Sequence, residues 1–151
     1  MVKDCCMKKN IILIAVLVLT GITLISCSKS KQANEDSSKY PATYVAYKNN
    51  PDWRGGETNP IISPDNFDGD IREAYASAAA VPDVLDHLYC YCYCAEDHGH
   101  KSLRTCFTDG HGSGCDICMN EARLAKRLHD KGYSILQIRN EIDKEFYEPY
   151  N

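Results

Sequence analysis

Several features that would place this chain of 151 residues in a common class of protein are missing from it. After residue 27 there is no apolar run long enough to span a membrane, no internal repeat and no series of strands. No paired carboxylates, nucleophile beside a base, or phosphate-binding loop is present, so hydrolysis and phosphoryl transfer have no support. Basic residues are not in excess, because 17 Lys and Arg stand against 21 Asp and Glu. A formal net charge of -4 argues against a nucleic-acid partner.

The N-terminus has the pattern of an export signal. Three lysines lie within the first nine residues, and residues 11–25 form an apolar run of the length of a secretory signal. The run ends in Leu-Ile-Ser-Cys, which resembles a bacterial lipobox with cleavage before Cys27. We therefore expect residues 1–26 to be a lipoprotein signal peptide and Cys27 to carry the lipid; an uncleaved anchor helix is the alternative. Either way, the chain is predicted to be extracytoplasmic and anchored to a membrane.

This assignment sorts the nine cysteines of the chain. Cys5 and Cys6 leave with the signal, and Cys27 is the predicted lipidation site. The other six lie between residues 89 and 118, where an oxidising compartment also permits a framework of three disulfides. These six are Cys90, Cys92, Cys94, Cys106, Cys115 and Cys118.

Helical patterns dominate the sequence around this stretch. A capping box of Asp70 and Glu73 predicts a helix that ends before Pro82, and a short second helix follows over 82–88. Beyond the cysteines, a helix is expected from residue 115 or 116 to 131, with Gly132 as its stop. A capping box of Ser134 and Gln137 begins the last helix, which pairs with the preceding one as an antiparallel hairpin.

The predicted fold is all-α: a small helical domain over residues 68–151, with an irregular Cys-rich loop between its helices. A lipid-anchored linker and an extended strap rich in aromatic residues and proline precede it over residues 27–67, with loose disorder of the strap as the alternative.

The run Tyr-Cys-Tyr-Cys-Tyr-Cys at residues 89–94, here called the CYCYC arm, alternates with period two. An extended arm would place all three thiols on one face, whereas a helical arm would place Cys90 and Cys94 together and turn Cys92 away. Two cysteines one residue apart rarely bridge each other, but both can grip one soft metal ion. Only the extended form gathers all three sulfurs.

The remaining candidate ligands lie further along the loop. Cys115 and Cys118 form a CxxC pair at a helix N-terminus, where amide dipoles stabilise a thiolate for metal ligation or disulfide exchange. Cys106 stands alone between this pair and the arm. His111, which lies among glycines, and His98 are candidates to complete the ligand set.

Residues 89–121 resemble the bacterial CYCXC, or PCYCGC-motif, lipoproteins. The CYCYC run, GHKSLRTCF, HGSGCDIC and the EA-rich helix match in order, and the resemblance covers residues 68–147 and the signal. The function of that family is poorly defined, and the selenocysteine attributed to some members implies redox or soft-metal chemistry. Tyr89 and Tyr93 replace the usual proline and glycine. If that glycine has a positive φ, Tyr93 is strained.

Three functions remain open from the sequence. The first is a lipoprotein that binds Zn or Cu(I) through the six cysteines and exchanges the metal with a partner. The second is a thiol–disulfide oxidoreductase, which is the only enzyme class with support, although no oxidoreductase fold surrounds the pair. The third is a binding module stapled by three disulfides.

Overall fold

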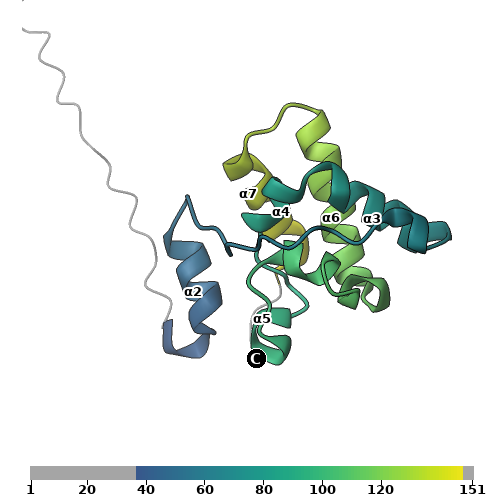
Figure 1. Ribbon diagram of the computed structural model, residues 1–151. Coiled ribbons are helices and arrows are strands. Elements are labelled where there is room, and N and C mark those ends of the chain that lie inside the picture. The colour runs from purple at the N-terminus through teal and green to yellow at the C-terminus, as the bar shows by residue number, and fades with distance from the viewer. Residues whose placement is uncertain (1–36, 148–151) are drawn as a thin grey trace, which may run out of the picture. The chain divides into compact units, whose positions relative to one another are not determined.

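The computed structural model describes residues 37–147, and all regular structure in this range is helical (Figure 1). The prediction of an all-α fold is therefore confirmed. The described residues belong to one compact unit, Glu35–Asn151. None of their helices is long and apolar enough to cross a membrane. The signal and Cys27 lie outside the described residues.

Six α-helices lie in the described part of the chain: α2 (Ala42–Asn49), α3 (Gly69–Ala80), α4 (Pro82–Asp86), α5 (Cys94–His98), α6 (Asp116–Asp130) and α7 (Ile135–Phe146). The short 3₁₀ turns there are η1 (Ser37–Lys39), η2 (Pro64–Asn66), η3 (Leu103–Phe107) and η4 (His111–Gly114).

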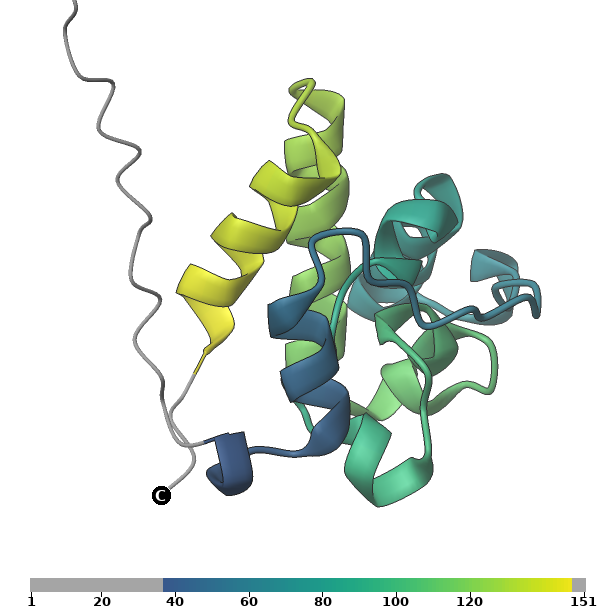
Figure 2. The same cartoon turned by 90° about the vertical axis from the view of Figure 1, so that its left-hand side faces the viewer.

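The α6–α7 pair forms as predicted (Figure 2). Gly132 follows α6 with a φ of 81°, which a glycine adopts without steric cost. Ser134 and Gln137 form the reciprocal capping box at the start of α7. Ile138 and Ile142 of α7 are fully buried, so the face of α7 that carries them packs into the core.

The α3 helix packs mainly on α6. Both helices bury small side chains, Ala74 and Ala78 on α3 and Ala122 and Ala125 on α6, which allows their axes to approach closely. The predicted start of α3 was wrong: its N-cap is Asp68 rather than Asp70, and no side-chain capping bond forms there.

The predicted strap is partly helical. Residues 50–63 have no helix, but residues 42–49 form α2. The expectation of an extended strap over this part was therefore wrong. Tyr44 and Tyr47 lie three residues apart on the buried face of α2 and pack on the rings of Tyr89 and Tyr91. Tertiary burial of these rings stabilises a helix that is too short to persist alone.

Two side chains of α7 hold α2 in place. Arg139 is buried and donates to the carbonyls of Tyr47, Asn50 and Pro51, and its guanidinium lies 4.1 Å from the centre of the Tyr47 ring. Asp143 accepts hydrogen bonds from the hydroxyls of Tyr47 (2.5 Å) and Tyr91 (2.7 Å). The C-terminal helix thus ties the strap to the CYCYC arm.

Candidate metal centre

Four cysteine thiols converge inside the domain. The Sγ atoms of Cys90, Cys94, Cys106 and Cys118 all lie within 4.8 Å of one another, and all four residues are buried. The Sγ of Cys90 lies 3.4 Å from that of Cys118 and 3.7 Å from that of Cys106. The four residues come from the CYCYC arm (Cys90 and Cys94), η3 and α6, so the fold brings together three segments that are separated in the sequence.

The CYCYC arm is neither the strand nor the helix considered from the sequence. Residues 90–93 form a turn closed by a hydrogen bond from the N–H of Tyr93 to the carbonyl of Cys90, and α5 begins at Cys94. The extended interpretation was therefore wrong. Tyr93 has a φ of 59° and is the one non-glycine residue with positive φ among the described residues. Because a left-handed backbone crowds a residue that carries a Cβ, the turn is strained at Tyr93.

This turn separates the arm's side chains by type. Cys90 and Cys94 face the buried thiols, while Tyr89 and Tyr91 pack on the aromatic rings of α2. The alternating tyrosines and cysteines of the arm therefore lie in two different environments, although the arm forms a turn and not a strand. Cys92 lies instead beside Cys115 and Cys118.

Cys92 lies against the CxxC pair. Its Sγ is 3.0 Å from that of Cys115, and these two sulfurs and the Sγ of Cys118 lie within 4.8 Å of one another. Cys115 is the N-cap of α6, as the sequence predicted, and both Cys92 and Cys115 are half-exposed. Cys118 thus belongs to two groups of thiols, one buried and one at the surface.

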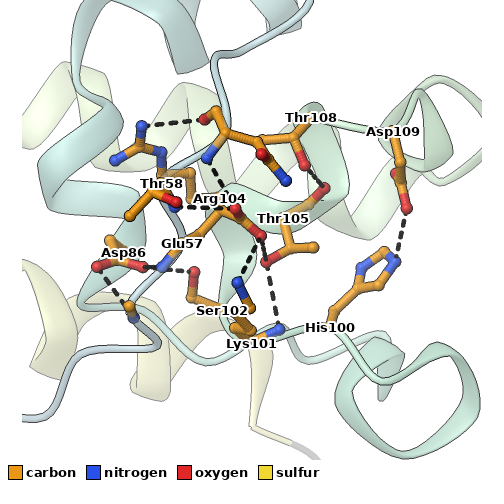
Figure 3. A network of polar contacts seen from close by, with 12 residues as sticks. Glu57, Thr58, Asp86, His100, Lys101, Ser102, Arg104, Thr105, Thr108 and Asp109 are labelled. Carbon is orange, nitrogen blue, oxygen red and sulfur yellow. Dashed lines mark hydrogen bonds and ion pairs between the residues drawn. The ribbon is translucent and has the colours of Figure 1, made fainter.

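A network of polar contacts fixes the loop that carries Cys106 (Figure 3). The buried carboxylate of Asp86 accepts from the backbone N–H of Glu57 (2.9 Å) and from the hydroxyl of Ser102 (2.9 Å). Glu57, also buried, accepts from the hydroxyl of Thr105 at 3.0 Å. These bonds join the strap, the end of α4 and the segment before Cys106.

The strap and the Cys106 loop also approach closely through their backbones. A Cβ on Gly55 would stand 2.3 Å from the carbonyl oxygen of Lys101, so only glycine fits there. Sequence reasoning missed the roles of Glu57 and Asp86. The segment around Ser102 and Thr105, which the family resemblance covers, was the available signal, because short polar side chains beside a buried cysteine need partners.

The histidines divide differently from the prediction. His98 and His111 lie outside both groups of thiols; their ring centres are 4.2 Å apart, and His98 is exposed. The missed residue is His100, which is buried with its Nδ1 3.2 Å from the Sγ of Cys106. Its Nε2 lies 3.1 Å from the carboxylate of Asp109 (Figure 3). The imidazole therefore orients Cys106, and the His-Gly-His sequence after the arm was the signal for it.

The pKa values of two buried thiols are shifted in opposite directions. Hydrogen bonds from Cys106, Cys118 and Cys90 lower the pKa of Cys94, while the hydrogen bond with Cys106 raises the pKa of Cys118. A cation at their centre would favour the thiolate form of every ligand, because opposite charge stabilises the ionised state.

The Glu121 side chain borders the buried thiols. Its carboxyl is fully buried and accepts from the N–H of Tyr91 at 3.0 Å. Burial raises the pKa of Glu121 well above its usual range. A negative charge here would repel the neighbouring thiolates.

Two of the distances between the buried sulfurs are close to those of a tetrahedral metal site. Zinc–sulfur bonds of ~2.3 Å require sulfurs ~3.8 Å apart along the edges of a tetrahedron. The 3.4 and 3.7 Å separations approach this edge length, whereas a disulfide needs ~2.05 Å. The buried cysteine cluster could therefore hold a metal ion.

One family model matches most of the chain. Residues 16–151 match a family described as "Protein of unknown function with PCYCGC motif". No curated protein and no solved structure matches the chain.

Proposed function

The chain belongs to the family of proteins of unknown function with the PCYCGC motif, and from this premise we propose that it binds a soft metal ion, Zn(II) or Cu(I). The ligands are the thiolates of Cys90, Cys94, Cys106 and Cys118. One observation carries the proposal: these four buried sulfurs lie within 4.8 Å of one another. Thiolates prefer Zn(II) and Cu(I) among biological metals, and four of them complete a structural zinc site.

Metal binding accounts for this arrangement better than three disulfides or redox cycling. Disulfides join cysteines in pairs, so they give no reason for four sulfurs to converge on a common point. A redox pair needs one accessible thiolate, and none of these four buried cysteines provides one, so redox cycling would have to use the half-exposed Cys92 and Cys115 and would leave the buried group unexplained. Burial of several thiolates is costly unless a cation compensates their charge.

The proposal also includes the compartment. Cys27 carries the lipid after removal of residues 1–26, and the residues directly after Cys27 connect this anchor to the metal-binding domain, which includes α2. Support comes from the lipobox-like Leu-Ile-Ser-Cys sequence and the basic N-terminus. A metal- or thiol-exchange protein in the same compartment is the expected partner.

Metal content of the mature chain tests the binding site. The protein is purified anaerobically with reductant, and Zn and Cu are counted by mass spectrometry. We expect Cys94→Ser and Cys106→Ser each to lose the buried metal, because three remaining thiolates bind far more weakly than four. Cys92→Ser, which changes a half-exposed thiol outside the buried group, is the matched control and should keep at least the one metal equivalent of the buried group.

Intact mass separates the alternatives. Protein taken from cells without reductant should show free thiols and a retained metal. A loss of six hydrogens with no metal adduct would establish the disulfide-stapled module and overturn the proposal. One or two fast-alkylating thiols in metal-free folded protein would favour the oxidoreductase.

Cell fractionation tests the anchor. The wild-type chain should sediment with membranes and incorporate a labelled fatty acid, and Cys27→Ser should lose the label. Cys5→Ser, within the predicted signal peptide, is the control and should remain labelled. Equal labelling of wild type and Cys27→Ser would contradict lipidation at this residue.

A further inference from the structure

The buried four-thiolate group leaves Cys92 and Cys115 without a role. Their sulfurs lie 3.0 Å apart, and each is within 4.8 Å of the Sγ of Cys118. These three atoms therefore form a second group with the spacing that a metal ion requires, and Cys118 is common to both groups. A thiolate sulfur has lone pairs enough to bind two metal ions at once.

The two groups differ in their access to solvent. The four cysteines of the first group are buried, whereas Cys92 and Cys115 are half-exposed. A surface pocket of about 300 Å³ adjoins Cys92, with Tyr91, Tyr93, Ile117, Glu145 and Phe146 as its other lining residues. Ile117 keeps 41% of its surface exposed between the two cysteines of the CxxC pair. An incoming ligand can therefore reach Cys92 from outside the domain.

We propose that Cys92, Cys115 and Cys118 form a second soft-metal site, a three-thiolate site for Cu(I) that shares Cys118 with the buried site and opens to solvent. The inference rests on the proposed function, because the shared thiolate presupposes a metal in the buried group. Three thiolates suit Cu(I), while zinc would need a fourth ligand from outside.

The open side makes this the site of metal exchange. A thiolate of a partner adds to the ion on its exposed side, and the bond to Cys92 or Cys115 then breaks. Loading the site releases the protons of Cys92 and Cys115 to water, since Cys118 is already a thiolate when the buried site is filled. No electron is transferred, so the step needs neither oxidant nor reductant.

A Cu(I) titration with a competing chelator tests the site. The reduced mature protein is titrated anaerobically, and retained copper is counted after gel filtration. Wild type should retain about two equivalents, and the Cys92→Ser/Cys115→Ser double variant about one. The remaining equivalent shows that this variant is folded, since the buried group draws on three separate segments of the chain.

The outcomes separate this inference from the proposed function. Equal copper retention by the double variant and wild type would overturn the second site and leave the buried one intact. A disulfide between Cys92 and Cys115 that persists when the buried metal is present in protein from the cell surface would also overturn it. If Cys94→Ser/Cys106→Ser retains as much metal as wild type, the buried site fails instead.

Discussion

Tyr93 is the residue at which the CYCYC arm changes direction. Its left-handed backbone lets α5 begin at Cys94, so that Cys90 and Cys94 lie together while Cys92 faces Cys115. A left-handed conformation costs a residue with a Cβ ~1–2 kcal/mol. The arrangement of two thiol groups thus depends on backbone strain at one position.

When Tyr93 is replaced, the glycine variant should be more stable than the alanine variant, which is the reverse of the usual order of stability. In the middle of a helix or strand, a protein with alanine at a given position is more stable than one with glycine by ~0.5–1 kcal/mol, because glycine loses more conformational entropy on folding. At this position we expect Tyr93→Gly to exceed Tyr93→Ala in free energy of unfolding by about 1 kcal/mol, since both lose the ring and only alanine keeps the strain. Urea denaturation of the reduced, metal-loaded variants measures the difference. A Tyr93→Ala variant as stable as Tyr93→Gly would show that the turn is unstrained.

Asp86 and Glu57 make the Cys106 loop sensitive to acid. Burial alone raises the pKa of each carboxyl, but hydrogen bonds outweigh it: the N–H of Glu57 and the hydroxyl of Ser102 lower the pKa of Asp86, and the N–H of Asn59 and the hydroxyl of Thr105 lower that of Glu57. A carboxyl with a lowered pKa stabilises the fold above its unfolded pKa, about 4. That contribution is lost as the pH falls through the lower, folded value.

The acid limb of the stability profile should therefore flatten when both carboxyls are removed. Wild type should lose free energy of unfolding more steeply below about pH 4 than Glu57→Gln/Asp86→Asn, which at neutral pH is already weaker by about 2–5 kcal/mol. Both proteins release metal in acid, so the difference between their profiles isolates the carboxyls. Asp83→Asn, at an exposed side chain, is the control and should follow wild type. Parallel profiles for wild type and the double variant would contradict the role of the network.

At the scale of the elements, features that depend on neighbouring residues could be predicted from the sequence, and features that depend on long-range packing could not. The α7 capping box and the stop at Gly132 depend on neighbouring residues, and both were predicted. The helicity of α2 was missed because its cause is the burial of Tyr44 and Tyr47 against residues more than forty positions away. His100 was missed for a related reason: the contact with Cys106 depends on how the loop folds back.

The strap should prove to be part of the domain when α2 is weakened. Tyr47→Ala removes a fully buried ring that stacks near Arg139 and contacts Tyr89, so we expect a loss of about 3–5 kcal/mol in the free energy of unfolding. Tyr133→Ala, at a side chain 40% exposed, is the control and should cost under about 1 kcal/mol. Chemical denaturation followed by circular dichroism measures both. If the two variants had the same free energy of unfolding, α2 would be a linker and not part of the folded domain.

At the scale of the whole molecule, the buried thiols join three segments of the chain around one point. The sequence predicted that six cysteines gather, but their division into a buried group and a surface group follows from a turn and from the direction of α6. An ion bound by Cys90, Cys94, Cys106 and Cys118 closes the loops between residues 90 and 118. Such cross-links stabilise a small domain by restricting its unfolded chain.

Removal of the metal should therefore lower the melting temperature. A ligand that binds only the folded state and is free at 1,000 times its Kd adds about 4.1 kcal/mol, which is a rise in Tm of at least about 8 °C for a domain of this size. Differential scanning calorimetry of the reduced protein, with metal and after chelation, measures the shift. The Cys94→Ser/Cys106→Ser variant should melt at one temperature under both conditions, because it has lost half of the buried ligands. If wild type also melts at one temperature, the buried thiols are core side chains, and the convergence of their sulfurs reflects packing alone.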